Sequence, residues 1–182
     1  MSLKQFSPPE KWILAGIPVL FILGSLMHFL YDFTGQNTLA ALFAPVNESV
    51  WEHSKLVLWP VILWWVLYDR FRGEQEQLCR DTWYAGALFA LLGALLTMPL
   101  IYYFYTEAFG TELLWVDILI LLLSLLAGQL GGLHMYRCSG GINPSLVLLI
   151  FGAVILIFVL FTFWPPRIPW FQDPLTGGYG IP

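Results

Sequence analysis

The chain has 182 residues, of which 58% are hydrophobic and 11% are charged, and its formal net charge is −4. A soluble domain carries about a quarter charged residues, so this composition excludes an ordinary water-soluble protein. The sequence also has no basic patch of the kind that nucleic-acid binding requires, which excludes that class.

Long apolar segments predict an all-α membrane protein with about five transmembrane helices. Roughly 20 apolar residues span a bilayer, and five segments approach or exceed this length: 12–31, 47–68, 82–105, 113–136 and 144–164. The first segment follows Lys4 and Lys11 as a signal peptide would, but it is long and lacks a small-residue cleavage site, so we expect it to be retained. We therefore expect one transmembrane domain over residues 1–164.

The distribution of basic residues predicts the orientation. With five spans, one side of the membrane collects six basic residues and the other side only Lys55 and Arg167; the six are Lys4, Lys11, Arg70, Arg72, Arg80 and Arg137. The positive-inside rule then predicts a multi-pass protein of the plasma membrane with a cytoplasmic N-terminus and an outer C-terminus.

The connection between the first two predicted spans contains an apolar run, 39–44, that is too short to cross a bilayer. We expect a short re-entrant or interfacial helix here, capped by Asn37 or Thr38 and ending at Pro45. Irregular backbone at membrane depth occurs only where it is buried in protein or lines a cavity, so this break favours a site nearby.

The stretch that follows, PVNESVWEHSK (45–55), is unusually polar for a membrane span. Asn47 as N-cap and Glu48 in the first helical turn explain its beginning as an ordinary helix start. After Lys55, however, the apolar run 56–67 provides only about 18 Å of helix, whereas the hydrocarbon core is roughly 30 Å thick. The polar residues before it therefore lie near or below the outer boundary, where they must face protein or water.

Helical spacing sorts these polar residues onto two faces. Glu48, Glu52 and Lys55 fall on one stripe, in which Glu52 and Lys55 can form an ion pair. His53 lies on a second face with Ser49.

The first predicted span supplies partners at a similar depth. It carries a histidine and an acid four residues apart near its outer end, so we expect five side chains to converge: His28, Asp32, Glu48, Glu52 and His53. Two imidazoles and several carboxylates suit zinc, manganese or iron. The ligands of such a divalent metal would be His28, Asp32, Glu48 and His53, with Glu52 as general base, and the supporting residues would be Asn47, Ser49, Lys55 and Asp117.

None of these spacings is diagnostic of a metal site, so two alternatives stay open. The cluster can hold a polar ligand without metal, or it can be structural hydrogen bonding. We do not expect a haem between His28 and His53. Asp117, about one turn inside the fourth span, is a functional candidate as an intramembrane acid, and an interfacial position is its alternative.

The lipid bilayer is one expected partner of this chain, and a second copy of the chain is another. Gly128 and Gly132 form a GxxxG spacing typical of close helix packing, which predicts a homo-oligomer through that face. The segment 165–182 is rich in proline and aromatic residues. We expect this tail to fold back across the outer mouth of the helices, and an anchor in the membrane interface is the alternative.

The string P-V-N-E-S-x-W-E-H at 45–53, the upstream His28 and the closing DPLTGGYG resemble a family of small bacterial polytopic membrane proteins of unknown function. The resemblance extends over nearly the whole chain and implies a fold and a location but no reaction. Zinc-dependent transmembrane hydrolases of lipid amides are a less similar group, because the last span here lacks their HxxxH motif.

Three functions are compatible with this sequence. The first is an outward-facing site that binds a cation or a small polar ligand. The second is an intramembrane metal-dependent hydrolase acting on a lipid-like substrate. The third is a non-enzymatic scaffold subunit.

Overall fold

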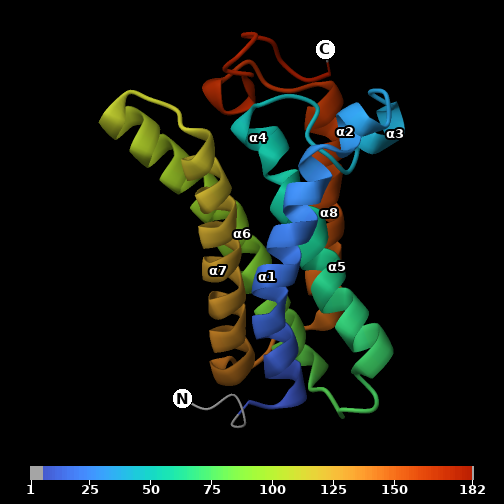
Figure 1. Ribbon diagram of the computed structural model, residues 1–182. Helices are drawn as coiled ribbons and strands as arrows, with labels where there is room; N and C mark the ends of the chain where they lie inside the picture. Colours follow the sequence, from blue (N-terminus) through green and yellow to red (C-terminus); the bar gives the residue numbers. More distant parts are fainter. Residues whose placement is uncertain (1–5, 182) are drawn as a thin grey trace.

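Residues 6–181 are described by a computed structural model, and they form a bundle of long helices with several short helices at one end (Figure 1). Lys4 and Pro182, which entered the predictions above, lie outside these residues. Apart from an isolated bridge between Gln172 and Tyr179, residues 6–181 contain no strand. The elements are α1 (Pro8–His28), α2 (Leu30–Phe33), α3 (Thr38–Ala41), α4 (Val50–His53), α5 (Lys55–Arg72), α6 (Arg80–Phe109), α7 (Leu114–Cys138), α8 (Pro144–Phe163) and the 3-10 helix η2 (Pro169–Phe171).

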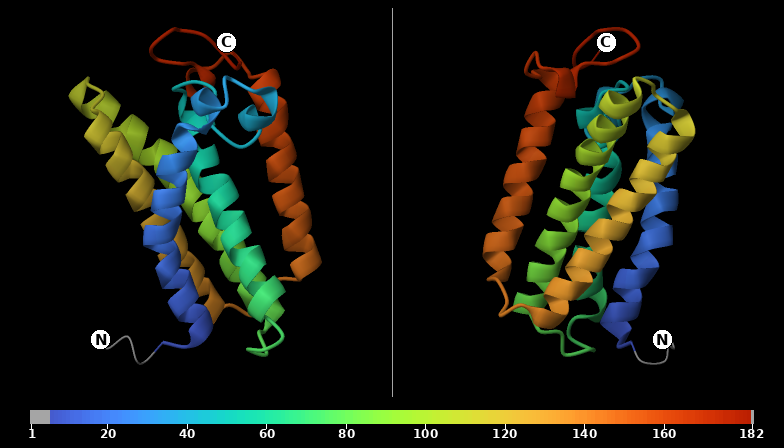
Figure 2. Two further views of the ribbon diagram at one scale, coloured as in Figure 1. Left: turned by 45° about the vertical axis from the view of Figure 1, so that its right-hand side comes forward. Right: turned by 90° about the vertical axis from the view of Figure 1, so that its left-hand side faces the viewer.

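Four of the helices in residues 6–181 are long and apolar enough to cross a membrane, namely α1, α6, α7 and α8. The predicted all-α architecture is therefore confirmed, and the four apolar helices fit the predicted membrane class. The helix α5 runs beside them (Figure 2), but it contains four charged residues: Lys55, Asp69, Arg70 and Arg72. Length and composition alone do not mark it as a span, so the fifth crossing stays a prediction.

Local signals explain where the long helices begin and end. In α1, the Ser7 side chain and the Glu10 side chain satisfy each other's backbone N–H groups, and Pro8 occupies the first turn, where its missing N–H costs nothing. The helix α6 ends at Gly110, whose φ of 63° lies in the left-handed region that favours glycine.

The helix α5 packs between α1 and α6 and supplies much of the core. Val57, Leu58, Val61 and Trp65 are all buried. A helix surrounded in this way can carry apolar residues on most of its faces, and its charges are confined to its two ends.

The helices α6 and α7 pack closely along their lengths, and small residues make this possible. A Cβ atom added at Gly128 would lie 2.5 Å from the Ala90 carbonyl oxygen, and one at Gly132 would lie 2.8 Å from the Gly86 carbonyl oxygen. The predicted close packing at Gly128 and Gly132 is present, but the partner is α6 of the same chain. A homo-oligomer through this face stays a prediction, and these two glycines are already in contact with α6.

The first two predicted spans are each interrupted near the outer end. After α1 the chain breaks at Phe29 before α2 begins, and the short α4 is separated from α5 at Ser54. The N-cap of α4 is Ser49 and not Asn47, since the Ser49 hydroxyl accepts from the Glu52 N–H. Glu48 thus precedes the helix, so its predicted place on a helical stripe with Glu52 is wrong.

The tail, defined here as residues 165–181, folds back over α4 at the end of the bundle opposite to the start of α1 (Figure 1). The indole of Trp51 stacks on Phe158 and also packs against Trp170 and Phe171 of η2. The Asn47 amide donates a hydrogen bond of 2.8 Å to the carbonyl oxygen of Gly180. The loop that carries Glu48 is therefore held by the tail.

Candidate functional site

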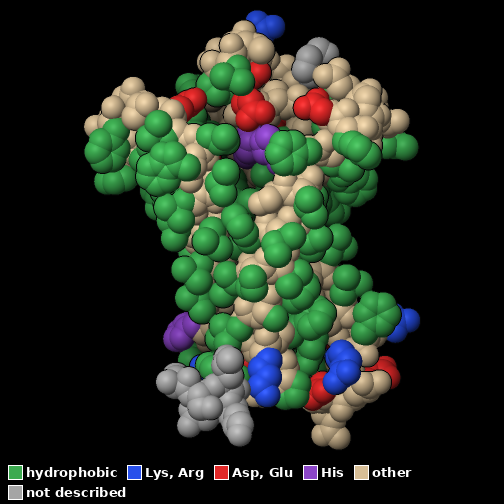
Figure 3. Space-filling view, in the orientation of Figure 1, with side chains coloured by type: hydrophobic (Ala, Val, Ile, Leu, Met, Phe, Trp, Pro, Cys, Tyr) green, Lys and Arg blue, Asp and Glu red, His purple; other side chains and the backbone are tan. Residues whose placement is uncertain are grey.

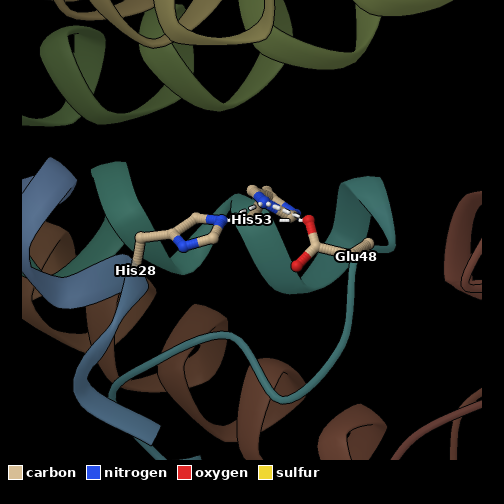
Figure 4. A group of neighbouring side chains, drawn as sticks. All are labelled: His28, Glu48 and His53. Carbon is tan, nitrogen blue, oxygen red and sulfur yellow. Dashed lines mark hydrogen bonds and ion pairs between the residues drawn. The ribbon is translucent and has the colours of Figure 1, made fainter. Parts of the chain in front are cut away.

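His28, Glu48 and His53 form a compact group, which we call the His–Glu cluster (Figure 4). The Nε2 atoms of the two histidines are 3.1 Å apart. A carboxylate oxygen of Glu48 lies 3.4 Å from Nε2 of His53 and 3.8 Å from Nε2 of His28. Three potential metal-ligating atoms from different segments of the chain thus converge on one point.

Each member is positioned by the local structure described above. His28 is the last residue of α1 and His53 the last residue of α4, so both rings project from helix ends. Glu48 stands in the loop before α4, which is fixed by the Asn47 side chain: its oxygen accepts from the Ser49 N–H and its nitrogen donates to Gly180. The end of α1, the loop before α4 and the end of α4 thus supply one side chain each to the cluster.

The surroundings of Nδ1 show which ring nitrogen of His53 carries the proton. The Nδ1 atom lies 3.0 Å from the carbonyl oxygen of Ser49, which can only accept a hydrogen bond. Nδ1 therefore carries the proton, and the lone pair of Nε2 points to the centre of the cluster. Metal-ligating histidines in proteins are commonly oriented by such a bond.

The electrostatics of the loop favour an ionised Glu48. Its interaction with the His28 imidazole is the main reason that the pKa of the Glu48 carboxyl lies below its ordinary value, and this effect outweighs the opposing effect of partial burial. A carboxylate in its charged form is the state in which it can bind a cation.

Glu52, the predicted general base, lies in a different network. Its carboxylate accepts from the Lys55 ammonium at 2.5 Å, from the Val46 N–H at 3.1 Å and from the Thr162 hydroxyl at 3.3 Å. Glu52 is buried and does not belong to the His–Glu cluster. The structure thus pairs Glu52 with Lys55, as the spacing predicts, but does not bring it to the histidines.

The other predicted residues divide between supporting and separate positions. Asn47 and Ser49 hold the Glu48 loop and the His53 ring, as described. Asp32 lies in α2 with its side chain exposed and is not part of the cluster. Asp117 accepts a hydrogen bond of 2.7 Å from the hydroxyl of Tyr105 in α6.

The His–Glu cluster faces a pocket of about 530 Å³, which we call the side pocket. Its deeper walls are apolar and come from α5, α6 and α7: Leu56, Met98, Ile120 and Leu121. Glu112 and Asp117 also line it, as do Pro174 and Leu175 of the tail. Metal-ligating atoms, two further carboxylates and an apolar chamber therefore share one space.

The sequence analysis missed the tyrosines that organise this pocket. Tyr102 donates a hydrogen bond to Glu112, and Tyr105 donates to Asp117. These tyrosines lie three residues apart and so on one face of α6. The two acids both follow the turn at Gly110 and are five residues apart. That pattern is visible in the sequence once the turn is placed.

A model of a family of unknown function, DUF6512, matches residues 1–181. The chain belongs to this family. The match confirms the family resemblance at the level of an uncharacterised family covering the whole chain. The chain matches no curated protein and no solved structure.

Proposed function

We propose that the protein is a multi-pass membrane protein that binds a divalent metal ion, best suited by zinc, through His28, Glu48 and His53. The observation that carries this proposal is the spacing of the three ligating atoms. Ligand atoms about 2.0–2.1 Å from a tetrahedral zinc ion lie about 3.3 Å from one another. The distances within the cluster, 3.1, 3.4 and 3.8 Å, bracket that value.

The composition of the cluster supports a catalytic role for the metal. Two histidines and one glutamate are a known ligand set of catalytic zinc, in which the fourth position is left for water or substrate. The cluster faces the side pocket, so a fourth ligand has room to enter. We therefore extend the proposal to a metal-dependent hydrolase, in which the ion lowers the pKa of a bound water.

The general base of such a hydrolase is better assigned to Asp117 than to Glu52. Asp117 lines the side pocket, whereas the Glu52 carboxylate is engaged by Lys55. Both carboxylates accept hydrogen bonds, but of the two only Asp117 lines the space that a substrate would occupy.

The proposed orientation places the cluster near the outer face of the plasma membrane. Lysine and arginine side chains gather at the end of the bundle opposite to the tail (Figure 3), where Arg80 pairs with Asp69 and Arg137 with Glu10. By the positive-inside rule this end is cytoplasmic, and the tail then lies outside.

The test is the metal content of the protein purified in detergent without chelator, measured by mass spectrometry. We expect about one equivalent of metal in the wild type, as a single three-ligand site predicts, and almost none in His28→Ala, His53→Ala or Glu48→Gln. His134→Ala is the matched control, because His134 is exposed near the opposite end of α7 and should leave the metal content unchanged.

A second step makes a negative result decisive. Wild-type protein that contains no metal is dialysed against Co²⁺ and its absorption spectrum recorded. Failure to take up Co²⁺ as well would leave the His28–His53 contact as a structural hydrogen bond and overturn the proposal.

A further inference from the structure

The side pocket opens on the flank of the bundle and not only at its end. Figure 3 shows the imidazoles in a hollow on the side of the molecule, below acidic side chains and flanked by hydrophobic ones. Three apolar residues that line the pocket are also strongly exposed: Phe29 by 66%, Leu114 by 75% and Ile118 by 49%. Exposed apolar side chains on a membrane helix face lipid, so the mouth of the pocket adjoins the bilayer.

The interior of the side pocket is suited to a hydrocarbon chain. Leu56, Met98 and Leu121 provide apolar walls from three different helices. A volume of about 530 Å³ lies within the range of pockets that enclose small ligands, roughly 300–1,000 Å³. Burying an alkyl chain there is favourable relative to water, but a chain already in the bilayer gains nothing from burial alone. The polar groups of the pocket must therefore select the ligand.

The charges lining the side pocket are of one sign. Glu48, Glu112 and Asp117 are carboxylates, and neither lysine nor arginine is among the lining residues within the described part of the chain. An anionic head group would be repelled by Glu112 and Asp117 even with a metal held by the His–Glu cluster. A neutral or cationic head group would not.

We propose that the side pocket receives a single-chain amphiphile from the adjacent lipid leaflet, with a neutral or cationic head group whose oxygen reaches the His–Glu cluster. This inference rests on the proposed function, because the head group is recognised by the metal. It names the substrate class of the hydrolase as a lipid-like ester or amide without a phosphate. Hydrolysis would add the elements of water across that bond and release an acid with an alcohol or an amine.

The experiment uses Co²⁺-loaded protein in lipid nanodiscs, with the cobalt absorption bands as the readout. Lauroyl hydroxamic acid is the probe, since it joins one alkyl chain to a metal-binding head that is uncharged in solution and loses a proton as it binds the metal. Ile118→Trp fills the mouth of the side pocket, whereas Leu119→Trp is its matched control, because Leu119 is 40% exposed but does not line the pocket. We expect Ile118→Trp to weaken probe binding about tenfold or more, which corresponds to about 1.4 kcal/mol, and Leu119→Trp to leave it unchanged.

Two further probes separate the possible failures. Acetohydroxamic acid has the head without the chain, and it should perturb the cobalt spectrum equally in both tryptophan variants. If it does, while lauroyl hydroxamic acid also fails to distinguish them, the metal site stands and the amphiphile inference is wrong. If neither the wild type nor either tryptophan variant binds Co²⁺, the proposed function itself is wrong.

Selection against anionic head groups is tested with dodecyl phosphate in the same assay. Dodecyl phosphate should bind more weakly than lauroyl hydroxamic acid. The double variant Glu112→Gln with Asp117→Asn should reduce this difference in affinity. Equal binding of the two probes to the wild-type protein would exclude selection against anionic head groups.

Discussion

Lys55 is fully buried in the bundle, yet each of its ammonium hydrogens has a partner. It donates to the carbonyl oxygens of Ala41 and Ala44 and to the carboxylate of Glu52. A buried charge is tolerated when it is paired and its remaining donors are satisfied. The pair also ties the loop after α3 to the start of α5, which fixes the segment leading to Glu48.

Removing one member of this pair should be more harmful than removing both. We expect Lys55→Met to lower the free energy of unfolding by about 3–5 kcal/mol, because it leaves the Glu52 carboxylate buried without its counter-ion. Adding Glu52→Gln should recover part of that loss. Unfolding titrations in mixed detergent micelles measure both effects.

The control is an exposed ion pair of the same bundle. Arg72 and Glu76 are 2.9 Å apart at the end of α5, and the Arg72 side chain is 54% exposed. Arg72→Ala should therefore cost less than about 1 kcal/mol. A similar cost for Lys55→Met and Arg72→Ala would contradict the structural role assigned to Lys55.

At the scale of the helices, the contact of α6 with α7 sets the shape of the bundle. The two helices approach closely near Gly86, Gly128 and Gly132 and lean away from α1 towards their connecting turn (Figure 1). The side pocket lies where they lean away, since it is lined by residues of α1, α6 and α7. The side pocket is therefore an opening between α1 and the α6–α7 pair, and not between α6 and α7 themselves.

This packing predicts opposite effects at two neighbouring glycines. Gly128→Ala should destabilise the protein by about 1–3 kcal/mol, because its methyl group meets the Ala90 backbone, which cannot move aside easily. Gly131→Ala meets nothing within 4 Å and should be neutral or stabilise by up to about 1 kcal/mol through helix propensity. Thermal unfolding of the two variants side by side measures the difference, and equal midpoints would show that α6 and α7 are not packed this way.

Much of the helical architecture was predictable, and the reason is the strength of apolar composition as a signal. The helices α1, α6, α7 and α8 stand out by length and hydropathy. The short helix α3 and its Asn37 cap are present where the apolar run and the capping residue predict them.

The path of the chain between the helices was less predictable. Glu48 was placed on a helix because N-cap preference does not separate Asn47 from Ser49. The convergence of His28 with His53 followed from matched depth, but the exclusion of Asp32 and Glu52 did not. Asp32 lies exposed in α2, and Glu52 pairs with Lys55. Periodicity along the sequence does not encode which of several nearby polar side chains meet in three dimensions.

At the scale of the whole molecule, we predict that the tail lies outside the cell and that the opposite end of the bundle is cytoplasmic. Cys79 and Cys138 are both exposed, at the end of the bundle proposed to be cytoplasmic. In intact cells, a membrane-impermeant maleimide should label neither. Ile168 of the tail is 48% exposed, so Ile168→Cys in a background without the native cysteines should be labelled.

Permeabilised cells provide the control, because all three cysteines should then react. Labelling of Cys79 in intact cells would reverse the orientation and place the His–Glu cluster on the cytoplasmic side. Labelling of both Cys79 and Ile168→Cys in intact cells would instead show that the chain crosses the membrane an even number of times between positions 79 and 168.

The hydrogen bond between Asn47 and Gly180 joins residues 133 positions apart. Because a chain is synthesised from its N-terminus, His28, Glu48 and His53 leave the ribosome well before the residues that later cover them. During biogenesis the cluster therefore passes through an interval in which its helices are inserted and its cover has not yet been made. The proposed metal ion would then have access to the cluster before the tail closes over it.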